Sequence, residues 1–165
     1  MKIAYLHGLE SSNDPTSSKI IWLNNNFDQV YTPSIKYHNK ESFTSITAHI
    51  KKQRPDYIIG SSMGGYFAYL IGATLGIPTI LFNPAVIGRS FDPVVDNSNL
   101  KETSHNVFLG KTDEVIDRAL VQSYFNCLGQ GEFTYTVYNG GHRVSAEVFI
   151  NSIKDVVGFK IIAMY

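Results

Sequence analysis

The chain has 165 residues, of which 44% are hydrophobic and 13% aromatic. This length and composition predict one globular domain over residues 1–165 and exclude an intrinsically disordered chain. Lys plus Arg and Asp plus Glu number 14 each, which argues against a nucleic-acid-binding protein because such proteins normally carry a basic excess.

The first half of the chain alternates between short apolar runs and runs with helical periodicity. Its predicted strands are Lys2–Leu6, Gln29–Thr32 and Tyr57–Gly60. Its predicted helices are Ile20–Phe27, Ser42–Gln53 and a third that follows the last of these strands and ends near Gly76. A polar loop rich in turn-forming residues, Leu9–Ser18, follows the first strand.

The second half repeats the same alternation. Its predicted strands are Thr79–Phe82, Val107–Leu109 and Phe133–Tyr138, and its predicted helices are Val115–Phe125 and one that begins near Ser145. The segment Val86–His105 is predicted to be a loop or a small cap. We therefore expect an α/β fold, a mostly parallel sheet of about six strands with helices on both faces. Functional sites of such sheets form at the carboxyl ends of the strands.

The strand-to-helix junction after Tyr57–Gly60 contains a Gly-x-Ser-x-Gly motif. Its nucleophile position is Ser62, between Gly60 and Gly64. The neighbouring Ser61 does not fit, because the motif would then require a glycine where Ile59 stands. The flanking glycines have no Cβ atom, which allows the sharp turn of a nucleophile elbow. An ordinary Gly/Ser-rich turn is the alternative interpretation.

Two further polar residues follow later strands and complete a catalytic pattern. Ser62, Asp113 and His142 occur in the chain order of an α/β-hydrolase triad, and parallel strands would bring them to one edge of the sheet. An imidazole activates a serine hydroxyl, and a carboxylate orients and stabilises that imidazole. The N–H groups of Met63 and Leu9 are the predicted oxyanion hole.

The carboxylate of the triad has several alternatives. Asp113 could instead cap the helix that follows it. Glu114 is the nearest competitor, whereas Asp117 falls within a predicted helix and both Asp92 and Asp96 fall in the irregular segment.

The general base also has alternatives. His142 could be a surface histidine of the turn that follows the last strand, but its position suits a general base. His7 is the second choice; next to Gly8, it better suits bracing the oxyanion loop. No chemistry is expected of the remaining histidines, His38, His49 and His105.

Other residue types restrict the compartment and the cofactors. Cys127 is the single cysteine, so an internal disulfide is excluded; we expect it to be a small buried hydrophobic residue of a protein in a reducing cytoplasm. No apolar run approaches the ~18 residues of a membrane span, and the opening apolar run is too short for a signal-peptide core. No Cys/His spacing is typical of zinc. We expect a cytoplasmic protein that needs no metal or organic cofactor and binds neither membrane nor nucleic acid.

Five sequence blocks resemble one family. They are Tyr5-Leu6-His7-Gly8 with Ser11-Ser12, the elbow Ile59–Tyr66, Asn83-Pro84-Ala85, Asp113-Glu114-Val115 and Gly140-Gly141-His142. Together they resemble the small bacterial YqiA-like esterases of the α/β-hydrolase superfamily, in the same order and over nearly the whole chain. The resemblance implies esterase activity on short acyl esters, with Ser62, Asp113 and His142 as the triad. The segment from Ala85 to Asp113 is shorter than is usual in that family.

These observations predict a serine hydrolase that forms an acyl-enzyme on Ser62. Because the cap segment is short, we expect an open, shallow pocket for small acyl groups, with apolar walls from Phe91, Val94, Val95 and Leu100. A thioesterase or amidase with the same triad is an alternative, since the triad does not select the leaving group. A non-catalytic binding protein of the same fold is another. The sequence predicts no oligomeric state.

Overall fold

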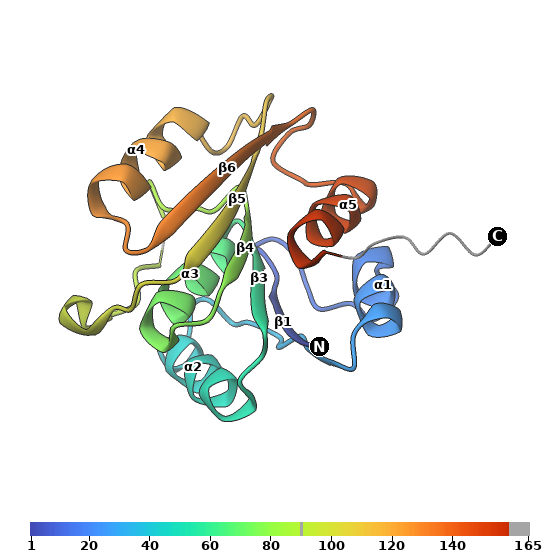
Figure 1. Cartoon of the computed structure of the whole chain (residues 1–165), viewed down its shortest axis with the longest axis horizontal. Helices are drawn as coiled ribbons and strands as arrows, with labels where there is room; N and C mark the ends of the chain where they lie inside the picture. Colours follow the sequence, from blue (N-terminus) through green and yellow to red (C-terminus); the bar gives the residue numbers. More distant parts are fainter. Residues whose placement is uncertain (90, 159–165) are drawn as a thin grey trace.

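Short parallel strands form the centre of the molecule (Figure 1). The computed structural model describes residues 1–89 and 91–158. The strands in this part are β1 Lys2–Leu6, β2 Gln29–Tyr31, β3 Tyr57–Ser61, β4 Thr79–Phe82, β5 Ser104–Gly110 and β6 Glu132–Tyr138. They lie in the order β2-β1-β3-β4-β5-β6, and every neighbouring pair is parallel. The predicted α/β architecture is confirmed.

Helices cover both faces of this sheet (Figure 1). They are α1 Ser18–Asn26, α2 Glu41–Gln53, α3 Met63–Leu75, α4 Arg118–Leu128 and α5 Ala146–Val157, with a 3₁₀ turn at Asn97–Asn99. Helices α1 and α5 lie side by side on one face, and α2, α3 and α4 cover the other.

The strands supply one hydrophobic core on each face because successive side chains of a strand point to opposite sides. Along β5, Val107 and Leu109 pack in the core under α2, α3 and α4, whereas Phe108 packs in the core under α1 and α5. The central strands are buried on both faces, so they read as continuous apolar runs rather than alternating ones.

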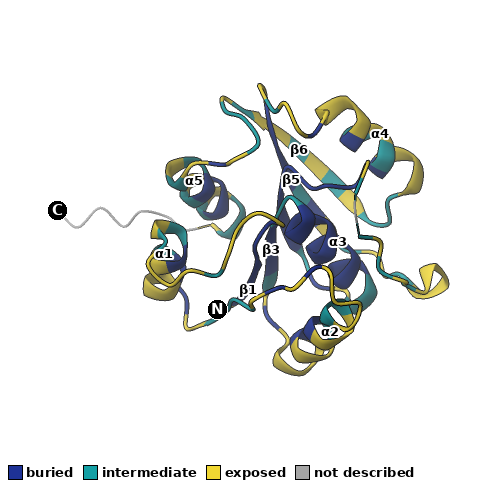
Figure 2. Ribbon diagram, turned by 180° about the vertical axis from the view of Figure 1, so that it is seen from behind, coloured by how far each residue is buried: buried dark blue, intermediate teal, exposed yellow. Residues whose placement is uncertain are grey.

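Helix α3 is the most buried helix and positions the elbow (Figure 2). Every residue from Met63 to Ala73 is buried, and the helix ends at Gly76, where φ is 71°. A left-handed glycine at this position is a common helix terminator. The predicted end of this helix is confirmed.

The predicted starts of two elements were wrong by about three residues. Strand β5 begins at Ser104, not at Val107, because its polar first residues pair with β4 and β6. Helix α4 begins at Arg118, not at Val115, because the Asp117 carboxylate caps it by accepting from the Ala119 and Leu120 N–H groups.

The prediction for Cys127 was also wrong. Its side chain is exposed on α4. The buried residues of this helix are Val121 and Phe125, which lie four positions apart on one helical face, and Cys127 is not on that face.

His105 is buried at the amino-terminal edge of the sheet, with 1% of its surface exposed. Its Nε2–H donates to the Gln130 carbonyl (3.0 Å), so Nδ1 of the neutral ring accepts from the Thr79 hydroxyl (2.8 Å). Burial lowers the pKa of His105 to about 4, from an ordinary value of 6.5. The unfolded chain therefore binds a proton between these pH values that the folded protein does not bind.

We expect the free energy of unfolding to decrease by about 2 kcal/mol between pH 7 and pH 5 through this group. The contribution of His105 is fully present above its unfolded pKa and is lost as the pH falls towards 4. Urea unfolding of His105→Gln should show a correspondingly smaller decrease over this pH range. The exposed His49, replaced by glutamine, is the control and should keep the parent's pH dependence. An unchanged pH dependence in His105→Gln would contradict the prediction.

Candidate active site

Ser62 lies at the junction of β3 and α3 in a backbone conformation that is rare for a non-glycine residue. Its φ is 54° and its ψ is −120°. Such strain costs about 1–3 kcal/mol and persists only where the surroundings hold it. Here the Ser62 N–H donates to the Phe82 carbonyl (2.9 Å), and the Ser62 carbonyl accepts from the N–H groups of Ala85 (3.0 Å) and Tyr66 (3.1 Å). The end of β4 thus holds the elbow from one side.

The glycines around Ser62 are required by close approaches. A Cβ atom on Gly60 would lie 2.2 Å from the Gly64 carbonyl oxygen, and one on Gly64 would lie 2.1 Å from the Leu6 carbonyl oxygen. A Cβ atom on Gly8 would lie 3.3 Å from the Cβ of Ser62. The loop after β1 therefore packs directly against the elbow.

Ser62, His142 and Asp113 form a continuous hydrogen-bonded array. His142 Nε2 lies 3.0 Å from Ser62 Oγ, and His142 Nδ1 lies 2.9 Å from Asp113 Oδ2. The Asp113 side chain is 2% exposed and that of His142 is 22% exposed, so solvent reaches the imidazole but not the carboxylate. With the Nδ1 proton donated to the carboxylate, Nε2 is free to accept the proton of the serine hydroxyl. The three side chains come from loops after β3, β5 and β6.

Asp113 has a second contact, with the turn that follows it. Its Oδ1 accepts from the N–H groups of Val115 and Ile116, each at 2.8 Å. One carboxylate oxygen therefore caps the turn that precedes α4 while the other contacts His142. The helix-capping alternative was wrong, because α4 begins at Arg118 and Asp117 caps it.

The competing carboxylates are engaged elsewhere or exposed. Asp92 forms an ion pair with Arg89 (2.9 Å), and Asp96 accepts from the Ser98 N–H (3.0 Å). Asp117 caps α4, and the side chain of Glu114 is exposed. His142 Nδ1 bonds to none of them.

His7 braces the loop after β1 through both ring nitrogens. Its Nδ1–H donates to the Gly8 carbonyl (2.8 Å), and its Nε2 accepts from the Ile35 N–H (3.0 Å). This pattern requires the neutral ring, and burial lowers the pKa of His7 below its ordinary value. The Tyr37 hydroxyl donates to the His7 carbonyl from the other side. His7 therefore holds the loop and does not contact Ser62 Oγ through a hydrogen bond.

The two predicted oxyanion donors flank this loop and the elbow. Met63 is the first residue of α3, and the N–H groups of a first helical turn have no acceptor within the helix. The hydrogen bonds among residues 1–89 and 91–158 leave the Leu9 N–H unused. Met63 directly follows Ser62 in the chain, and Leu9 directly follows Gly8, which packs against Ser62.

Asn83, at the end of β4, is a buried residue for which the sequence predicted no role. Asn83 is 1% exposed, and its side-chain amide reaches the loop that carries His142. An asparagine directly before a proline at a strand end was the available signal, because asparagine tolerates positive φ and satisfies several backbone groups at once.

An open depression of about 450 Å³ lies beside the loop after β1. Its lining residues are Leu9, Ile35, Lys36, Tyr37, His38 and Asn39. Phe91 packs edge-on against His38, with ring centroids 4.9 Å apart. Phe91, one of the predicted apolar walls, thus contacts a residue that lines the depression, but none of the four predicted walls is itself a lining residue.

Two of the other predicted walls were wrong. Val94 is fully exposed, so it covers nothing. Leu100 precedes Lys101, whose N–H donates to the Ala73 carbonyl (2.7 Å) near the carboxyl end of α3. Ser62 is at the opposite end of that helix. The cap segment runs along α3, because the Tyr66 hydroxyl donates to Asp92 (2.8 Å) at the beginning of this path.

Among residues 1–89 and 91–158, no group of three or more His, Cys, Asp or Glu side chains has a geometry that could hold a metal ion. Helices long and apolar enough to cross a membrane are likewise absent from these residues.

Solved structures of several hydrolases share this fold. Est1E from Butyrivibrio proteoclasticus matches with a TM-score of 0.65 over 94% of this chain and 86% of its own, at 16% identity. An S-formylglutathione hydrolase from Agrobacterium tumefaciens matches with a TM-score of 0.67 over 96% and 82%, at 14% identity. A Xanthomonas campestris protein classed with hydrolases of the alpha/beta superfamily matches with a TM-score of 0.68 over 95% and 98%, at 13% identity.

A family sequence profile matches most of the chain. The profile of the uncharacterised protein family UPF0227 covers residues 2–125, which include Ser62 and Asp113, whereas His142 follows the matched stretch. The chain therefore belongs to UPF0227, the YqiA-like family that its motifs resemble, and has the α/β-hydrolase fold.

Proposed function

We propose that this protein is a serine esterase that cleaves short acyl esters through an acyl-enzyme on Ser62. The observation that carries the proposal is the unbroken array from Ser62 Oγ through the His142 ring to the Asp113 carboxylate, with bonds of 3.0 and 2.9 Å. The strained elbow supports it, because backbone strain in folded proteins clusters at active sites.

In the proposed reaction, Ser62 Oγ attacks the ester carbonyl carbon while His142 Nε2 takes its proton. Asp113 stabilises the resulting imidazolium through the Nδ1–H bond. The Met63 and Leu9 N–H groups stabilise the negative oxygen of the tetrahedral intermediate. His142 then protonates the departing alcohol, and in the second half it deprotonates a water molecule that releases the acid from Ser62.

The depression beside Leu9 supports small substrates. It is open to solvent, and exposed polar residues such as Lys36 and Asn39 line part of it. A long acyl chain would leave much of its apolar surface in water, so it would gain little affinity there. The array does not distinguish an oxygen ester from a sulfur ester such as the S-formylglutathione in the name of the Agrobacterium neighbour, so a thioesterase is the second candidate.

The decisive experiment is intact-mass analysis after exposure to a fluorophosphonate. We expect one covalent adduct on the parent and none on Ser62→Ala, because only an activated serine reacts with this probe. Ser61→Ala is the matched control, since it removes the neighbouring hydroxyl and should leave labelling unchanged. A folded parent without an adduct would exclude an activated Ser62 and would favour the non-catalytic binding protein.

The substrate class follows from the same protein offered 4-nitrophenyl esters of increasing acyl length. We expect kcat/KM to be highest for short chains. A steady rise beyond about eight carbons would contradict the proposed shallow pocket.

A further inference from the structure

Asn83 lies at the carboxyl end of β4, between the strand that precedes Ser62 and the strand that leads to Asp113. Its φ is 44°, in the left-handed region that asparagine tolerates better than most residues, and its side chain is buried. A buried amide must satisfy its donors and its acceptor within the protein. The partners of Asn83 therefore show what this side chain holds together.

The amide oxygen binds the end of β5. The Gly110 N–H donates to Asn83 Oδ1 at 2.7 Å. The Asp113 N–H in turn donates to the Gly110 carbonyl (3.4 Å) as the chain turns towards the carboxylate. Asn83 thus contacts β5 directly, at a residue that lies three positions before Asp113.

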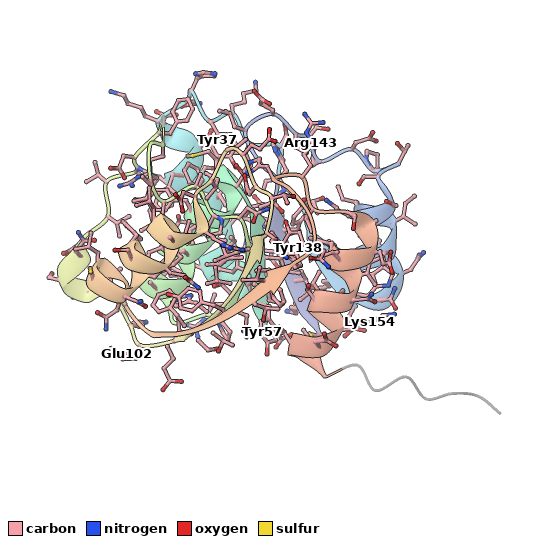
Figure 3. The ribbon with its side chains drawn as sticks, turned by 90° about the horizontal axis from the view of Figure 1, so that it is seen from above. Tyr37, Tyr57, Glu102, Tyr138, Arg143 and Lys154 are labelled. Carbon is pink, nitrogen blue, oxygen red and sulfur yellow. The ribbon has the colours of Figure 1, made fainter. Side chains whose placement is uncertain are left out.

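The amide nitrogen binds the loop that carries His142. Asn83 Nδ2 donates to the His142 carbonyl (2.9 Å) and to the Tyr138 hydroxyl (2.6 Å), and the Gly141 carbonyl lies 3.3 Å away. The Tyr138 hydroxyl donates to the same Gly141 carbonyl at 3.0 Å. Tyr138 lies at the end of β6, and burial raises the pKa of its phenol, so the hydroxyl remains a donor at neutral pH (Figure 3).

The loop after β5 and the loop after β6 are in close contact. A Cβ atom on Gly110 would lie 2.7 Å from the carbonyl oxygens of both Gly140 and Gly141. The Thr112 N–H also donates to the Gly140 carbonyl (3.0 Å). The Asp113 loop and the His142 loop therefore contact each other directly. The Asn83 amide hydrogen-bonds to the His142 loop and to the end of the strand that leads to Asp113.

We propose that Asn83 is a positioning residue that sets the separation of the Asp113 and His142 loops through its single amide. This inference rests on the proposed function of the Ser62–His142–Asp113 array. An amide that only satisfied buried groups would affect stability alone. A positioning amide affects the reaction of the folded protein, because a displacement of about 1 Å in a catalytic group can cost about 100-fold in rate.

The test compares Asn83→Gly with the parent and with Thr79→Val. Glycine adopts a φ of 44° without strain. The first variant therefore removes the side-chain amide without forcing the backbone out of its conformation. Thr79→Val removes a buried side-chain hydrogen bond to His105 from the same strand, at the opposite edge of the sheet. It therefore reports the cost of losing such a bond far from Ser62.

We expect Asn83→Gly to lower kcat by about 100-fold with little change in KM, and to slow fluorophosphonate labelling of Ser62 to a similar extent. The proton resonance of the His142 Nδ1–H bonded to Asp113 should broaden or disappear. Thr79→Val should keep the parent's kcat, labelling rate and resonance at a temperature where it is folded. An Asn83→Gly variant with the parent's kcat and resonance would overturn the inference.

If Asn83→Gly does not fold, Tyr138→Phe decides. It removes one partner of the amide and the donor to Gly141, and we expect a several-fold loss of kcat at constant KM; parental kinetics would overturn the inference. Failure of the proposed function is a different outcome, because the parent itself would then remain unlabelled. In that case the His142 resonance alone still tests whether Asn83 positions this loop.

Discussion

Replacing Asp113 by asparagine is expected to lower kcat by about 10⁴-fold while leaving the free energy of unfolding nearly unchanged. Asparagine keeps Oδ1 as the acceptor for the Val115 and Ile116 N–H groups, so the turn remains capped. Its amide nitrogen would replace Oδ2 and present a donor to His142 Nδ1. The imidazole would then carry its proton on Nε2, where it could no longer accept the proton of Ser62. Steady-state kinetics and urea unfolding of the same preparation check both halves of this prediction.

Asp117→Asn provides the matched control, because Asp117 likewise accepts from two backbone N–H groups and has no histidine partner among the described residues. It should match Asp113→Asn in stability and match the parent in kcat. Equal kcat values for the two variants would refute an orienting role for Asp113.

The second large effect is expected from Gly64→Ala, which should destabilise the fold by about 4 kcal/mol or more. The new Cβ atom would lie 2.1 Å from the Leu6 carbonyl oxygen and 2.4 Å from that of His7. Both contacts are with backbone, which cannot rotate away as a flexible side chain can. To relieve them, α3 would have to move from β1, and the elbow would open. Thermal unfolding and the yield of folded protein measure this change.

Gly141→Ala is the comparison for that variant. Its Cβ atom would lie 3.5 Å from the Thr112 carbonyl oxygen, an ordinary contact. We expect a change in the free energy of unfolding within about 0.5 kcal/mol. A Gly64→Ala protein as stable as Gly141→Ala would show that the packing of α3 on β1 is looser than the structure has it.

Local periodicity determined most of the architecture. The strand Thr79–Phe82 was predicted with its observed bounds, because a β-prone run between a proline and an Asn-Pro pair can be recognised without tertiary information. The end of α3 at Gly76 could likewise be predicted from the local sequence. The elbow motif and the order Ser62, Asp113, His142 predicted which residues would meet, because parallel strands place their carboxyl ends at one edge.

Contacts between distant segments were decided by the tertiary structure. The polar start of β5 became a strand because Thr79 and Phe133 flank His105 in the sheet, a pairing that no local pattern encodes. The exposure of Val94 and the path of the cap segment along α3 depended on where Arg89, Asp92 and Tyr66 meet.

Asn83 shows the same difference between what the local sequence predicts and what the tertiary structure decides. The sequence by itself placed an asparagine after a strand and before a proline, which predicts a turn. Only the fold brings its amide to the carbonyl of His142, 59 residues away, and to the end of β5. Periodicity follows from the backbone geometry of a few neighbouring residues, whereas such a hydrogen bond requires the whole sheet to be assembled first.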